Sequence, residues 1–205
     1  MRAVDETVSK IVLGGIPPVA LMLLGWWGTL GLLGDSPAIP WTAGAGFAIG
    51  IGLDATLLRN RLSSLYTLSW PALVCVATFY SVMIYGFFMG SPVPNLVVGV
   101  FGGFVVGRRH TGEQIRTSEA QRDAHIAAAV ASGIMFVLCC MTAWLALTEP
   151  TITGQVQHML GLPFEPTMGL LRVVTLIGGL GLVTVEYFAA LATANWAARA
   201  IPGAE

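Results

Sequence analysis

The chain has 205 residues, of which 55% are hydrophobic and only 10% are charged, and its net charge at pH 7 is −1. A soluble domain carries about 25% charged residues, so this chain has too few charges to cover a water-exposed surface. The composition predicts an all-α integral protein of the cell membrane, and it excludes a disordered chain, a coiled coil and a nucleic-acid-binding protein.

Six stretches of the chain are apolar enough to cross a lipid bilayer, whose ~30 Å core needs about 20 residues of helix. They lie at residues 13–34, 41–58, 69–89, 92–107, 125–147 and 168–196. The connections between them are short, so neighbouring helices are expected to be antiparallel. We therefore expect one polytopic transmembrane domain over residues 1–205, a glycine-rich bundle of six helices.

The distribution of basic residues predicts which end of each span faces the cytoplasm. With a cytoplasmic N-terminus, the inner segments carry every Lys and Arg of the chain except Arg172. Cytoplasmic loops are enriched in these residues, so both termini are expected to be cytoplasmic.

Two proline turns, at residues 34–40 and 90–94, each precede a glycine-rich stretch that ends in arginines. This similarity indicates duplicated helical hairpins, a plan found in transporters. The alternative is that the turns are unrelated, because proline is common at the start of helices.

Glycines recur at helical spacing in several spans, and small residues let membrane helices approach closely. The helix-packing candidates are Gly46, Gly50, Gly99, Gly103, Gly107 and Gly179. They predict either tight packing within one chain or, for residues 92–107, association with a second copy in a homo-oligomer. Residues 178–181 are also the best candidate for a break in the last helix.

Glu186 falls near the middle of the 168–196 stretch, where an ionisable side chain is costly and indicates function. It shares one helical face with Thr175, Gly179 and Thr193. This small, partly polar face predicts that the carboxyl points into the bundle, where desolvation disfavours its charged form. We expect Glu186, with Thr175 and Thr193, to bind a proton or cation; the alternative is a protonated carboxyl that only joins two helices.

Asp54 lies on the same face as Gly46 and Gly50, one turn before the cytoplasmic end of its span. It is a second transport or ion-binding candidate, on the inner part of a pathway. The alternative is an interfacial aspartate that pairs with Arg59 or Arg61.

Arg172 lies near the outer end of the last span. It is expected either to pair with an outer-loop acid (Asp35, Glu149 or Glu165) or to draw anions into an outer vestibule. His158, the histidine of the outer loop, has no closely spaced companion ligand. We therefore expect no metal site, and nothing in the sequence indicates a cofactor.

Three functions remain open. The first is a small transporter or channel for an ion or small solute, with Glu186 as its intramembrane carboxylate. The second is a non-catalytic membrane subunit or assembly factor that packs on a partner protein through glycine faces. The third is a lipid-modifying enzyme with Arg108, Arg109, His110 and Glu113 at the headgroups, although no catalytic motif supports it.

Overall fold

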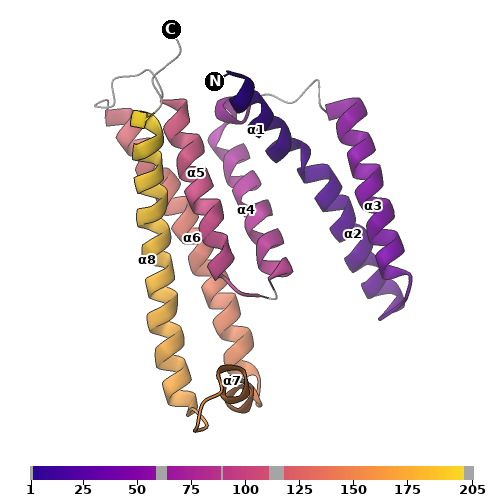
Figure 1. Cartoon of the computed structure of the whole chain (residues 1–205), viewed down its shortest axis with the longest axis vertical. Helices are drawn as coiled ribbons and strands as arrows, with labels where there is room; N and C mark the ends of the chain where they lie inside the picture. The colour runs from indigo at the N-terminus through magenta and orange to yellow at the C-terminus, as the bar shows by residue number, and fades with distance from the viewer. Residues whose placement is uncertain (1, 59–63, 89, 111–117, 201–205) are drawn as a thin grey trace. The chain divides into compact units, whose positions relative to one another are not determined.

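A computed structural model describes residues 2–58, 64–88, 90–110 and 118–200, which are helical or form turns (Figure 1). The α-helices are α1 (Arg2–Gly14), α2 (Ile16–Leu33), α3 (Ile39–Leu53), α4 (Trp70–Phe87), α5 (Leu96–Arg109), α6 (Ser118–Thr148), α7 (Ile152–Leu160) and α8 (Met168–Ala200). Three short segments accompany them: the π-helix η1 (Asp54–Leu58) and the 3₁₀ turns η2 (Leu65–Thr67) and η3 (Val93–Asn95).

Within the described residues, four helical segments are long and apolar enough to cross a membrane. They are Asp5–Leu33, Trp70–Phe87, Ser118–Thr148 and Met168–Arg199. The first runs through α1 and α2. The other two expected spans, 41–58 and 92–107, overlap α3 and α5. These helices have 15 and 14 residues and are shorter than a bilayer needs on their own.

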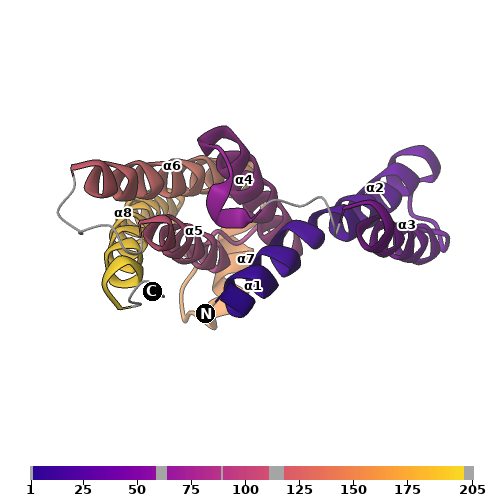
Figure 2. The ribbon, with the colours of Figure 1, turned by 90° about the horizontal axis from the view of Figure 1, so that it is seen from above.

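The chain divides into two compact units, Met1–Trp70 and Pro71–Glu205, each described here by itself. In the first unit, α2 and α3 lie side by side (Figures 1 and 2). A Cβ atom on Gly46 would stand 2.7 Å from the carbonyl carbon of Leu21, and one on Gly50 would stand 2.5 Å from the nitrogen of Pro18. Numbers rise along α3 as they fall along α2, so this glycine-packed pair is antiparallel.

Hydroxyl groups join the other end of the same pair. The Thr29 and Thr42 Oγ1 atoms are 2.7 Å apart, and Thr42 also donates to the carbonyl oxygen of Gly25 at 3.1 Å. Gly46 and Gly50, two of the glycines expected to pack helices, therefore lie in the contact between α2 and α3. Hydrogen bonds join the two helices at the other end of this contact.

In the second unit, α8 packs against both α5 and α6. Figure 2 looks along these helices and shows the three grouped together. Gly99, Gly103 and Gly107 of α5 lie against α8 at Glu186, Ala190 and Ala194 respectively. Both series advance by four residues at each step, so α5 and α8 are parallel. We call this contact the α5–α8 seam.

Small residues fill the interior of this unit and large apolar residues cover its outside. Alanines 124, 127, 128, 190, 194 and 197 are all buried. Along α8, by contrast, Leu176, Ile177 and Phe188 are each more than 60% exposed. Such an apolar exterior exceeds what soluble monomers expose, and small residues at helix contacts are typical of packing in lipid.

Helix α8 runs without a break from Met168 to Ala200, so residues 178–181 do not interrupt it. The glycines of α5 pack on α8, whereas those of α3 pack on α2. The short helix α7 lies in the connection between α6 and α8.

Candidate functional site

Glu186 lies inside the α5–α8 seam and is only 2% exposed. A side chain on Gly99 would collide with the Glu186 carboxyl, so the absence of one lets that carboxyl lie directly against the α5 backbone. Its Oε2 atom is buried and has no hydrogen-bond partner. The backbones of α5 and α8 stay close together beyond Glu186, at Gly103 and Gly107. A Cβ on Gly103 would be 2.9 Å from the Ala190 carbonyl carbon.

Asn95 is a second buried polar group on the same face of α5, one helical turn before Gly99. It is 2% exposed, and neither its Oδ1 nor its Nδ2 atom has a hydrogen-bond partner. It ends the 3₁₀ turn η3 and stands at the N-cap position of α5, but its side chain makes no cap hydrogen bond. Along the helix axis, Asn95 and Gly99 are separated by about 6 Å at 1.5 Å per residue.

Buried polar groups normally find partners, and an unsatisfied one costs about 1–3 kcal/mol. Glu186 and Asn95 are therefore two buried polar groups, an acid and an amide, that each have an atom without a hydrogen-bond partner. A proton or a cation would satisfy the free oxygen of Glu186, and a small polar solute could pair with the amide of Asn95.

The hydroxyl groups predicted beside Glu186 are not brought to it. Thr193 donates to the carbonyl oxygen of Ala189, four residues earlier on its own helix, at 2.6 Å. Along the straight α8, Thr193 lies roughly 10 Å and Thr175 roughly 16 Å from Glu186. Gly179 faces α6, where a Cβ would stand 3.7 Å from the Cβ of Cys139, an ordinary contact.

Asp54 lies at the junction of α1 and α2 in the first unit. A Cβ on Gly14 would stand 2.9 Å from each carboxylate oxygen of Asp54, and Oδ1 is buried without a partner. Pro17 and Pro18 have no N–H to donate to the carbonyls four residues earlier, those of Leu13 and Gly14. The acid thus lies against Gly14, at a junction where two helical N–H donors are missing. The partners expected for it, Arg59 and Arg61, lie outside the described residues.

Arg172 is exposed in the second turn of α8. Within the described ranges it makes no ion pair, and the outer-loop acids Glu149 and Glu165 accept hydrogen bonds from Thr151 and Thr153 instead. The expected pairing with those two acids is therefore not seen.

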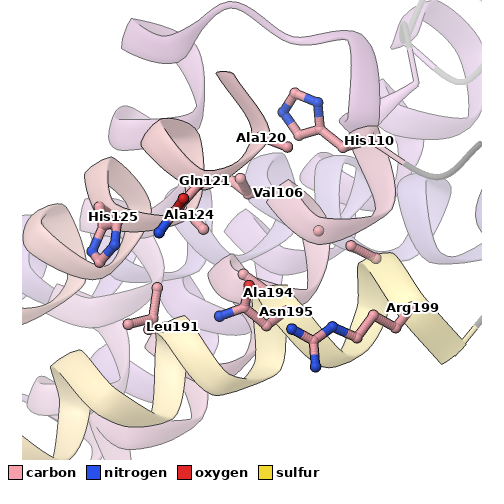
Figure 3. Close-up of a pocket in the computed structure, with 12 residues that line it drawn as sticks. Val106, His110, Ala120, Gln121, Ala124, His125, Leu191, Ala194, Asn195 and Arg199 are labelled. Atoms are coloured by element: carbon pink, nitrogen blue, oxygen red, sulfur yellow. The ribbon is translucent and has the colours of Figure 1, made fainter. Parts of the chain in front are cut away.

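A pocket of about 450 Å³ opens where α5 and α8 end and α6 begins (Figure 3). Its polar lining consists of His110, Gln121, His125, Asn195 and Arg199. Figure 3 shows α8 presenting Asn195 and Arg199 on one side of the pocket and α6 presenting Gln121 and His125 on the other.

Hydrogen bonds between helices brace this pocket. His110 Nε2 lies 3.1 Å from Asp123 Oδ2, which links α5 to α6. His125 Nδ1 lies 2.8 Å from the Tyr187 hydroxyl oxygen, which links α6 to α8. The histidine proposed for lipid chemistry, His110, is thus tied to an aspartate, whereas Glu113 lies outside the described residues.

Sequence reasoning missed Asn95 as a buried group, and it missed His125, Asn195 and Arg199 as a cluster. The signal for Asn95 was available, because it precedes Gly99 by four residues and so extends the glycine face. The pocket could not be found in this way, because its residues come from three helices whose pairing no local pattern encodes.

No protein-family model, curated protein or solved structure matches this chain. Across the part of the chain that the structure describes, no three metal-ligating side chains gather in one place. We therefore infer the function from the geometry of the α5–α8 seam and of the pocket.

Proposed function

We propose that this protein is a small membrane transporter or channel for an ion or small solute, and that Glu186 binds and releases a proton or cation. The observation that carries the proposal is the burial of Glu186 in the α5–α8 seam with one carboxyl oxygen unpartnered. Acids inside apolar helices are rare and mark ion pathways and proton relays.

The surroundings of Glu186 favour exchange over permanent pairing. Helix α5 meets α8 at and beyond Glu186 through Gly99, Gly103 and Gly107, none of which carries a charge. Glu186 has no positively charged side chain paired with it among the described residues. Because a buried charge is costly, its carboxylate is neutralised by binding a proton or a cation. Asn95 adds an amide that can coordinate through oxygen or donate through nitrogen.

The proposal places six helices across the bilayer. Helix α3 continues into η1, so that helical structure covers residues 39–58, and η3 with α5 covers residues 93–109. At 1.5 Å per residue these stretches reach roughly 30 Å and 25 Å, which fits a bilayer core and its interface.

Both termini are proposed to be cytoplasmic. In the second unit, Arg108 and Arg109 in the last turn of α5 and Arg199 in the last turn of α8 lie at the same end of parallel helices. Arg122, near the start of α6, is close to that end, because the pocket joins the start of α6 to the ends of α5 and α8. This arrangement supports an inner face rich in arginine.

Asp54 is proposed as a second binding group near the inner end of the pathway. Its buried Oδ1 has no hydrogen-bond partner, and a carboxylate oxygen suits a proton or a hard cation. Arg172 lies near the start of α8, at the end of that helix away from Arg199. It is proposed to line an outer vestibule.

The proposal is tested by thermal unfolding of the full chain in detergent against a panel of Na⁺, K⁺, Mg²⁺, amines and carboxylic acids at several pH values. A ligand present at 100 times its Kd is expected to stabilise the wild type by roughly 2.7 kcal/mol, and Glu186→Gln is expected to remove that stabilisation. If no ligand stabilises the wild type and Glu186→Gln is equally stable, Glu186 is a neutral packing group. The non-catalytic subunit then becomes the better account.

A further inference from the structure

The pocket at the end of the second unit has a lining suited to a negatively charged ligand. Among its described lining residues the one formal charge is that of Arg199, and no carboxylate takes part. Asn195 and Gln121 add amide donors. The pocket therefore offers cationic and neutral donors from two helices that face each other (Figure 3).

The start of α6 contributes a second, independent attraction for an anion. Ala120 and Gln121 line the pocket and belong to the first turn of this 31-residue helix. The first N–H groups of a helix have no partner within the helix, and their dipoles point positive charge outward. Phosphate groups bind at such helix starts.

His125 is held in place at the edge of the pocket. Its Nδ1 is engaged by the Tyr187 hydroxyl group at 2.8 Å. With that hydroxyl as the donor, the neutral ring carries its proton on Nε2 and has one further donor to offer. His110 is fixed in turn by Asp123. The site is thus a braced cavity with several donors, not a single exposed arginine.

We propose that this pocket binds a phosphate group, either as free phosphate or as the headgroup of an anionic lipid. A guanidinium can hold a phosphate through two parallel hydrogen bonds, and the first turn of α6 can bind its remaining oxygens. This binding is separate from the proposed exchange at Glu186, so each can fail without the other.

Two measurements on the full-length protein distinguish the sources of the phosphate. In detergent, the shift of the unfolding temperature with inorganic phosphate is compared with that in sodium chloride of equal ionic strength. For the lipid source, native mass spectrometry measures how much phosphatidylglycerol and how much phosphatidylcholine the protein retains. Each is repeated on Arg199→Gln and on Arg122→Gln, a control that removes an exposed α6 arginine outside the pocket.

Arg199→Gln is expected to weaken binding of phosphate or of phosphatidylglycerol by about tenfold or more, as loss of a charge-assisted hydrogen bond requires, whereas Arg122→Gln binds like the wild type. Arg199→Lys keeps the charge and is expected to fall between them. A response to inorganic phosphate identifies free phosphate, and selective retention of phosphatidylglycerol alone identifies a lipid headgroup. The proposal is overturned if the wild type responds to neither, or if Arg199→Gln and Arg122→Gln respond alike. Arg199 would then serve only the carboxyl end of α8.

Discussion

Replacing Gly103 by valine is expected to lower the free energy of unfolding by about 1–3 kcal/mol. A Cβ at this position would lie 2.9 Å from the Ala190 carbonyl carbon and still closer to its oxygen. These are backbone atoms of α8, which cannot move aside as the end of a flexible side chain can. The two helices must therefore separate, which also removes the packing around Glu186.

Gly102→Val is the matched control for this experiment. Gly102 precedes Gly103 on the same helix, and nothing lies within 4 Å of a Cβ placed there. The cost of placing valine in a helix is the same at both positions. The difference in unfolding free energy between the two variants therefore measures the cost of disrupting the α5–α8 seam. Unfolding can be followed by tryptophan fluorescence, since Trp196 of α8 lies 6.4 Å from Phe104 of α5 between ring centroids. Equal stability of the two variants would show that α5 and α8 do not pack in this register.

Replacing Glu186 by glutamine is expected to abolish solute-coupled proton movement while leaving the fold intact. Glutamine has nearly the same shape and fits against Gly99, but its amide neither carries a negative charge nor exchanges a carboxyl proton. The full chain would be reconstituted into liposomes that contain a pH-sensitive dye, and gradients of Na⁺, K⁺ or pH would be applied. We expect flux in the wild type, and flux at the level of empty liposomes in Glu186→Gln.

Two variants control this experiment. Glu165→Gln removes an exposed acid of the loop between α7 and α8, whose Oε1 accepts a hydrogen bond from Thr153, and is expected to keep wild-type flux. Glu186→Asp keeps a carboxyl on a side chain one methylene shorter, and we expect partial flux. A Glu186→Gln protein that transports like the wild type would remove Glu186 from the pathway.

The helices themselves could be predicted from the sequence, because their apolar length is a local property. The expected spans at 69–89 and 168–196 correspond to α4 and α8 closely. The inward direction of Glu186 was also a local inference, since small residues surround it on one face, and its burial agrees. The sequence pattern does not show which helix packs against the Glu186 face of α8.

The partner of the glycine face depends on long-range packing, which one sequence does not encode locally. The spacing of Gly99, Gly103 and Gly107 favoured packing within one chain but also allowed a second copy, and in the structure α8 covers them. Thr193 was placed near Glu186 by its position on the helical face, but its hydroxyl satisfies its own backbone instead. Asn95 is buried, as its place on the Gly99 face of the helix indicates, but what covers it depends on long-range packing.

The most direct test of the central claim is infrared difference spectroscopy of the protonated carboxyl stretch, recorded with and without the cation that most stabilises the protein. If Glu186 exchanges a proton for that cation, the wild type loses a protonated-carboxyl band on binding. The Glu186→Gln protein shows no such change. Identical difference spectra in the two proteins would contradict the account, because Glu186 would then keep its protonation state and serve only to pack α8 against α5.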